Sequence, residues 1–146
     1  MNLDELYQTI ILDHYREKHH SGLRDPYEAE VHHVNPSCGD ELTLRVHLDG
    51  GTIADMSYAG EGCSISQAST SVLGGLVIGQ DINYFSGLYD EFLEMMHSKG
   101  EITPDEDRFE DAIAFAGVSK FPARVKCALL AWSALRDAVA QASAKE

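Results

Sequence analysis

Between residues 41 and 58 the chain has the pattern of a β-hairpin. In the first half of this segment, polar residues alternate with the apolar residues Leu42, Leu44, Val46 and Leu48. Asp49-Gly50-Gly51 follows, and these turn residues predict a return into a second strand over about 52–58. Because alternation with a period of two places the apolar side chains on one face of a sheet, other elements of the chain must cover that face.

Apolar residues at helical spacing predict the covering elements. A first amphipathic helix is expected to stop at Ser21-Gly22 and carries the stripe Leu3, Leu6, Tyr7, Ile10, Ile11 and His14. Further helices are expected over about 63–79 and 83–98, and a short strand over 30–34. Pro122 opens a last helix, whose core stripe is Val125, Ala128, Leu129, Trp132, Leu135 and Val139.

The charge of the chain excludes two classes of partner. With 24 acidic residues against 11 Lys and Arg in 146 residues, the net charge is −13, which repels nucleic acid and anionic membrane surfaces. Nine acidic and two basic residues lie between Asp90 and Asp111. We interpret this stretch as a solvated, partly helical face; a docking surface for a basic partner is the alternative.

The sequence also argues against a membrane protein or a secreted one. Residues 62–80 carry no charge, but only eight of these nineteen are apolar, which is too few for a membrane span. Residues 1–5 show neither a basic nor an apolar signal region, so we expect a single domain in the reducing cytoplasm.

Three cysteines stand out in such a chain, because an odd number cannot be fully paired. Cys38 lies in the polar loop Pro36-Ser37-Cys38-Gly39-Asp40, and Cys63 lies where a glycine-flanked loop enters a predicted helix. Cys127 has Arg124 and Lys126 close in sequence. A helix N-terminus and neighbouring cations both favour the thiolate, so each thiol is expected to ionise readily.

Three thiolates and Asp40 would make a four-coordinate set of the kind that zinc prefers. The cysteines are too far apart in sequence for a local zinc knuckle, so only the tertiary fold could bring them together, and packing as small hydrophobic residues is the alternative. His32 or His33 could approach a metal near Cys38, although Asp40 is the better candidate. No local signature of a Cys-His hydrolase surrounds any of the three cysteines.

Three segments together resemble the iron–sulfur assembly proteins of the IscU/NifU N-terminal superfamily. They are Asn35-Pro36-Ser37-Cys38-Gly39-Asp40, Gly60-Glu61-Gly62-Cys63-Ser64-Ile65-Ser66 and Arg124-Val125-Lys126-Cys127-Ala128-Leu129-Leu130-Ala131-Trp132. The chain most resembles the SufU branch, because Lys126 precedes the third cysteine where IscU has a histidine, and the Leu-Pro-Pro-Val-Lys chaperone motif of IscU is missing. The long interval between Cys63 and Cys127 matches the insertion typical of SufU.

The resemblance implies an α+β fold, in which about five helices pack against a small three-stranded antiparallel sheet, as in SufE/NifU-like and IscU-type proteins. It implies one domain over residues 1–146, with an acidic insertion at about 88–118. A frayed C-terminal tail is expected over 141–146.

The resemblance also implies a zinc site formed by Cys38, Asp40, Cys63 and Cys127. The implied activity is that of a zinc-dependent sulfurtransferase, which accepts persulfide sulfur from a SufS-type cysteine desulfurase and relays it to downstream Suf assembly proteins. The persulfide carrier of the family corresponds to Cys38. In SufU-like proteins a histidine of the desulfurase is thought to take over a zinc position, and Arg124 is a candidate for steering that exchange and holding the released thiolate. The alternatives are an IscU-like scaffold that holds an Fe–S cluster and a structural zinc-binding interaction domain.

Overall fold

The computed structural model describes residues 2–145 and contains one three-stranded antiparallel sheet. The strands β1 (Ala29–Asn35), β2 (Asp40–Asp49) and β3 (Thr52–Glu61) follow one another in space as in sequence. The predicted hairpin is confirmed, with β3 continuing three residues beyond the expected end. At the centre of the sheet, Leu44 of β2 lies opposite Val31 on one side and Tyr58 on the other.

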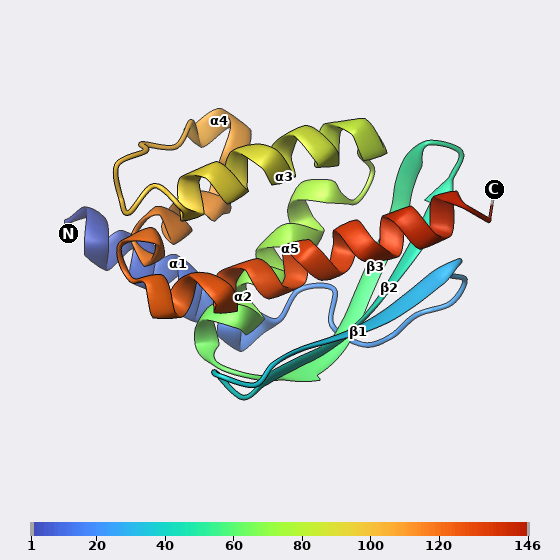
Figure 1. Cartoon of the computed structure of the whole chain (residues 1–146), viewed down its shortest axis with the longest axis horizontal. Coiled ribbons are helices and arrows are strands. Elements are labelled where there is room, and N and C mark those ends of the chain that lie inside the picture. Colours follow the sequence, from blue (N-terminus) through green and yellow to red (C-terminus); the bar gives the residue numbers. More distant parts are fainter. Residues whose placement is uncertain (1, 146) are drawn as a thin grey trace.

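Helices cover one face of this sheet, so the predicted α+β fold is confirmed. They are α1 (Leu3–Glu17), α2 (Ser64–Val77), α3 (Ile82–Met96), α4 (Glu106–Phe109) and α5 (Pro122–Ser143), together with the short 3-10 helices η1 (Glu110–Ala116) and η2 (Val118–Lys120). Figure 1 shows the sheet on one side of α5 and α3 on the other. The long helix α5 packs directly on β1 and β2, and its first turn therefore meets the end of the sheet where these two strands are joined.

The core lies between the sheet and α5. The alternating apolar residues of β2 are all buried, as expected, and Leu44 and Val46 are fully inaccessible. Trp132 of α5 stacks on Phe92 of α3 with the rings nearly parallel and their centroids 3.9 Å apart. Its indole N–H donates to the Ser69 hydroxyl of α2 over 3.1 Å, so the buried polar atom of this large side chain is satisfied.

The predicted amphipathic helix forms as α1, but its apolar stripe is not fully buried. No residue of α1 is buried, and Leu3 and Leu6 are 59% and 40% exposed. Tyr7 and Ile11 pack against the core only in part, where α1 meets α2 and η1. The helix also ends at Glu17, four residues before the predicted stop, because Lys18 adopts a left-handed cap conformation.

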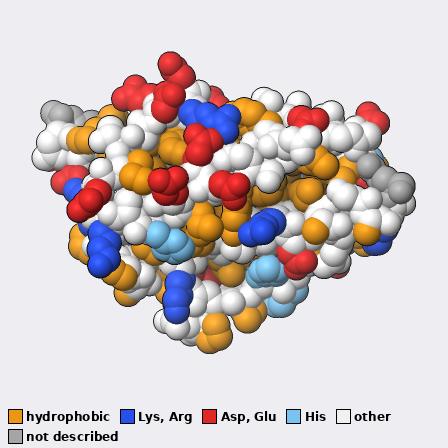
Figure 2. Space-filling model, turned by 45° about the horizontal axis from the view of Figure 1, so that its top comes forward, with side chains coloured by type: hydrophobic (Ala, Val, Ile, Leu, Met, Phe, Trp, Pro, Cys, Tyr) orange, Lys and Arg blue, Asp and Glu red, His pale blue; other side chains and the backbone are white. Residues whose placement is uncertain are grey.

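The segment 88–118 is partly helical and presents its charge to solvent. All nine acidic residues between Asp90 and Asp111 are exposed, and acidic side chains gather over the face formed by α3 and α4 (Figure 2). Asp111 also anchors the segment to α1, because its carboxylate lies 2.8 Å from His14 Nε2. This exposure is compatible with a solvated face and with a docking surface for a basic partner, so both interpretations stay open.

At the C-terminus, α5 continues through Ser143 and buries Ala142 completely, where a frayed tail was expected from residue 141. Residue 146, the last of that tail, lies outside the described residues. Among residues 2–145, none of the helices is both long enough and apolar enough to cross a membrane.

Candidate metal centre

Cys38 lies at the tip of the tight turn that joins β1 to β2. The turn is closed by a hydrogen bond from the Cys38 amide to the carbonyl of Asn35 (3.2 Å). Gly39 follows with φ of +68°, a left-handed conformation that glycine adopts at little cost. The turn therefore places the Cys38 side chain beside the start of α5, with Sγ 4.0 Å from the carbonyl oxygen of Ala123.

A hydrogen bond connects Asp40 with the backbone of Cys63. Asp40 is the first residue of β2 and is 2% exposed, and its Oδ1 accepts a hydrogen bond from the Cys63 amide over 2.8 Å. Cys63 caps the N-terminus of α2, as predicted, and its Sγ lies 3.5 Å from the Ser66 amide and 4.0 Å from Asp40 Oδ2. A Cβ on Gly62 would overlap the Asp40 carboxylate and lie 2.6 Å from Ser66 Oγ. This glycine is therefore needed for the approach of the loop to the carboxylate.

Cys127 completes the cluster from the second turn of α5. It is 3% exposed, and its Sγ lies 2.6 Å from Cys38 Sγ. One ligand atom from each of Cys38, Asp40 and Cys127 lies within 4.8 Å of the other two. Cys63 lies outside this group of three but is in contact with it through Asp40.

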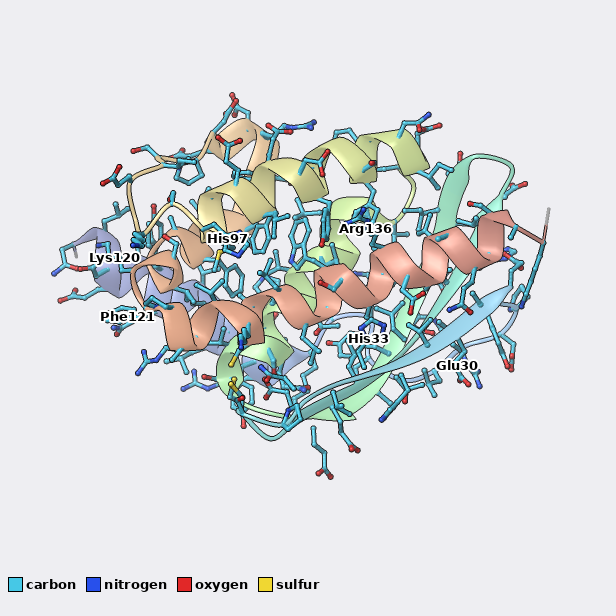
Figure 3. The ribbon with its side chains drawn as sticks, viewed as in Figure 1. Glu30, His33, His97, Lys120, Phe121 and Arg136 are labelled. Atoms are coloured by element: carbon cyan, nitrogen blue, oxygen red, sulfur yellow. The ribbon has the colours of Figure 1, made fainter. Side chains whose placement is uncertain are left out.

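The two candidate histidines are engaged elsewhere. His33 points from β1 toward α5 (Figure 3), where its Nε2 lies 2.9 Å from the Asp137 carboxylate. His32 Nδ1 lies 3.0 Å from Thr43 Oγ1 on the exposed face of the sheet. Neither belongs to the group formed by Cys38, Asp40 and Cys127.

The sequence predicts a lowered pKa for the Cys127 thiol, and this prediction is wrong. Burial raises the pKa of the Cys127 thiol, and the neighbouring Cys38, Cys63 and Asp40 raise it further. Arg124 and Lys126 are close in sequence but both are exposed, so they do not offset burial and the anionic neighbours. A cation among these groups would reverse the balance, because it stabilises thiolate and carboxylate together.

The donor atoms fit zinc. Sulfur ligands and carboxylate oxygens are ligand types that zinc takes in four-coordinate protein sites. Two thiols and a buried carboxylate meet here, and the third thiol, that of Cys63, lies 4.0 Å from the carboxylate. These residues come from three separate places in the fold: the β1–β2 turn, the N-terminus of α2 and the second turn of α5. A zinc ion at this position would join all three.

Arg124 lies on the exposed side of α5, one turn before Cys127. Its guanidinium group stacks over the ring of Phe121, 5.2 Å from the ring centroid. Phe121 itself is 52% exposed and lies at the start of α5 beside Lys120 (Figure 3). Arg124 thus lies on the surface, one turn of α5 before Cys127.

A groove that the sequence did not predict reaches Ser64, the neighbour of Cys63, and Arg124, one turn before Cys127. Its volume is about 450 Å³, and its walls include Tyr7, Ile11 and Leu12 of α1, Ile65 of α2, Phe121 and Arg124. Tyr7 and Ile11 belong to the predicted amphipathic stripe of α1. An apolar stripe predicts burial equally well by the chain's own core and by another molecule, so periodicity alone could not separate the two.

Comparisons with known proteins agree with the three cysteine motifs. The NifU-like N terminal domain matches residues 6–128. The chain is 42% identical to the iron–sulfur cluster assembly scaffold protein IscU of Streptococcus pyogenes serotype M1, over 94% of this chain and 84% of that protein. It is also 42% identical to the zinc-dependent sulfurtransferase SufU of Bacillus subtilis (strain 168), over 96% of this chain and 93% of that protein.

A solved structure shares the fold. The putative iron–sulfur cluster assembly scaffold protein for the SUF system from Fervidobacterium islandicum AW-1 superimposes with a TM-score of 0.83 at 34% identity, covering 94% of this chain and 99% of that one. The resemblance seen in the cysteine motifs is confirmed. The chain belongs to the family of NifU-like N-terminal domains, and its relatives include both IscU and SufU proteins.

Proposed function

We propose that this protein is a zinc-dependent sulfurtransferase, which accepts persulfide sulfur from a SufS-type cysteine desulfurase and relays it to iron–sulfur cluster assembly. The proposed zinc ligands are Cys38, Asp40, Cys63 and Cys127. The observation that carries the proposal is a difference in exposure within one cluster. Asp40 and Cys127 are buried, whereas Cys38 and Cys63 are partly exposed, and of these two only Cys38 stands at the tip of a turn.

The role of each residue follows from this arrangement. Bound zinc would keep the thiols deprotonated at neutral pH. The buried Asp40 and Cys127 and the helix-capping Cys63 hold the centre, while Cys38, at the tip of its turn, is the ligand that we expect a partner to reach. Cys38 must leave the centre before it reacts, and a donor from the desulfurase is expected to replace it. Arg124, exposed one turn before Cys127, is suited to hold the released thiolate.

The transfer itself is a thiol–persulfide exchange. The Cys38 thiolate attacks the terminal sulfur of the desulfurase persulfide, and a new S–S bond forms at Cys38 Sγ. The S–S bond at the desulfurase cysteine breaks, and that cysteine leaves as a thiolate. No electron acceptor is needed, because one persulfide is made for each that is consumed. The same exchange in reverse sense would pass the sulfur to a downstream Suf assembly protein.

The groove along α1 supports a partner-dependent step. Its walls include apolar residues of α1 together with Lys120 and Arg124, so a desulfurase bound there would contact the first turn of α5, which Cys38 Sγ approaches at the Ala123 carbonyl. A carrier thiol must be reduced to act, and the reducing cytoplasm, where we expect this protein to be, would keep Cys38 reduced. The acidic surface argues against nucleic acid or an anionic membrane as a partner.

The test replaces Cys38 with Ser and supplies the desulfurase and cysteine. Mass spectrometry should find persulfide on the original protein and none on the Cys38→Ser variant. Ser37→Ala, which changes an exposed neighbour in the same turn, is the matched control and should load normally. Undiminished loading of Cys38→Ser would refute the carrier assignment.

A scaffold for an Fe–S cluster is the second candidate, favoured by the same sulfur-rich donor set and by the IscU relatives. Metal analysis after anaerobic purification separates the two. Zinc near one equivalent without labile sulfide supports the sulfurtransferase, and a cluster that transfers to an apo-ferredoxin supports the scaffold. A purely structural zinc domain predicts instead that adding this protein leaves desulfurase turnover unchanged.

A further inference from the structure

Asn35 carries a buried hydrogen-bond donor that has no partner. The residue is 8% exposed, and among residues 2–145 its Nδ2 is one of two buried side-chain polar atoms without a hydrogen bond; the other is the Tyr58 hydroxyl. Leaving such a donor unpaired costs stability, because the group has given up its hydrogen bonds to water. An unpaired buried group in a native protein therefore calls for an explanation, and a binding role is one of the known ones.

The position of Asn35 connects it to the candidate metal centre. It is the last residue of β1 and lies directly opposite Asp40, the first residue of β2. Side chains of directly opposed residues share one face of the sheet, with Cβ atoms about 4.5–5.5 Å apart. Both residues are buried at the end of the sheet that α5 covers, and the Asn35 carbonyl closes the turn that carries Cys38.

The Asp40 carboxylate can accept more than the one hydrogen bond it receives. Oδ1 accepts from the Cys63 amide, and Oδ2 lies 4.0 Å from Cys63 Sγ. A carboxylate offers about four lone-pair directions. When one is used by a metal, the orientation of the group is normally held by further hydrogen bonds. A neutral amide opposite Asp40 supplies such a bond without adding charge to the centre.

We propose that Asn35 is a positioning residue of the metal centre, whose Nδ2 donates a hydrogen bond to the Asp40 carboxylate when that carboxylate binds zinc. The proposal rests on the zinc site of the proposed function. It assigns the unpaired donor to the ligand that lies opposite it, and it explains why a polar side chain stands at the buried end of β1. Metal binding would orient the Asp40 carboxylate so that it accepts the hydrogen bond from Asn35 Nδ2. Without the metal, Asn35 Nδ2 stays unpaired, which lowers the stability of the metal-free protein.

The test compares zinc affinity with the stability of the metal-free protein. Asn35→Leu removes the donor and keeps a side chain of similar size. Chelator competition should show a zinc dissociation constant about 10- to 100-fold higher than that of the original protein. The melting temperature of the chelator-treated variant should not fall, because the substitution removes an unpaired polar group. A lower melting temperature with unchanged zinc affinity would mean that Asn35 is a packing residue and would overturn the proposal.

Tyr58→Phe is the matched control, because it removes the other buried unpaired group at a position on β3. It should leave zinc affinity unchanged; a fall equal to that of Asn35→Leu would show that affinity merely follows the fold, against the proposal. If Asn35→Leu does not fold, Asn35→Ala is measured in the same way with the same expected loss of affinity.

A double-mutant cycle tests the acceptor. In an Asp40→Ala background, Asn35→Leu should weaken zinc binding no further, and an additive loss would exclude Asp40 as the partner. Zinc binding by the original protein distinguishes a failure of this proposal from a failure of the proposed function. If it binds no zinc, the zinc site itself fails, whereas tight binding that Asn35→Leu leaves intact defeats only the role of Asn35.

Discussion

The Sγ atoms of Cys38 and Cys127 lie 2.6 Å apart, although 89 positions separate the two residues in the chain. A disulfide bond is only about 0.6 Å shorter. An oxidant could join two reduced thiols that lie this close, and a metal bound to both would compete with that oxidation.

We expect a Cys38–Cys127 disulfide after metal removal. Chelator-treated protein exposed to diamide should lose two thiols and give a Cys38–Cys127 cross-link in unreduced peptide maps, with Cys63 still alkylatable. Zinc-loaded protein should stay reduced under the same treatment. A cross-link formed mainly through Cys63 would contradict the arrangement.

Asp40→Ala should weaken zinc binding at least about tenfold while leaving the helix content nearly unchanged. The substitution removes a proposed ligand and also the acceptor of the Cys63 amide, but the apolar core lies elsewhere. Chelator competition and far-UV circular dichroism measure the two effects. Asp49→Ala, at the exposed far end of β2, is the control, and an unchanged zinc dissociation constant in Asp40→Ala would count against Asp40 as a ligand.

Gly62→Ala and Gly75→Ala should act in opposite directions. A Cβ at Gly62 overlaps the Asp40 carboxylate, so this variant should lose about 1–3 kcal/mol of stability and bind zinc more weakly. Gly75 lies inside α2 with open space around it, and alanine there should stabilise the fold by about 0.5–1 kcal/mol. Denaturant unfolding measures both, and equal effects would show that the loop at Gly62 has room to move.

The Arg24–Asp55 ion pair should make stability depend on acid pH. The hydrogen bonds from Arg24 hold the pKa of Asp55 below its usual range. Their stabilisation is thus fully present above the pKa of an unfolded aspartate, about 3.9, and is lost as pH falls through the lower folded pKa. Both side chains are about one third exposed, so solvent screening limits the contribution to about 0.5–1 kcal/mol.

Asp55→Asn should therefore lower the free energy of unfolding at pH 7 by about that amount and flatten its decline below pH 4. Asp25→Asn is the control, because the Asp25 carboxylate is 81% exposed and lies 3.6 Å from Arg45. Urea titrations at pH 7 and pH 3 measure both variants, and parallel pH profiles for Asp55→Asn and the original protein would contradict the prediction.

Phe121→Ser should weaken binding of the desulfurase about tenfold without changing zinc affinity, since Phe121 is an exposed aromatic ring in the wall of the groove and aromatic side chains are common binding anchors. Isothermal titration with the desulfurase measures the effect. Leu23→Ser, which alters an exposed apolar residue outside the groove, should bind normally. Equal binding by both variants would place the desulfurase on another surface, such as the acidic face over α3 and α4.

Features set by neighbouring residues could be predicted from the sequence. The alternation around Leu44 defined β2, Pro122 marked the first turn of α5, and Cys63 was correctly placed at the N-terminus of α2. Each depends on a few adjacent residues and on backbone preferences that act locally.

Features set by residues that are distant in the chain could not be predicted from the sequence. The pKa of Cys127 depends on burial and on partners 64 or more positions away, which outweigh the cations beside it in sequence. The unpaired amide of Asn35 and the groove along α1 likewise appear only when separate elements meet. The resemblance to a family supplied the proposed ligand set, because spacing alone could not bring the three cysteines together.

The stacking of Trp132 on Phe92 gives the protein an internal optical probe. Trp132 is the single tryptophan of the chain, is fully buried, and lies on the same helix as Cys127, five positions further along. Its fluorescence should therefore report on the packing of α5 against α3. A red shift of the emission during zinc removal or desulfurase binding would reveal that the helix carrying the third cysteine has moved.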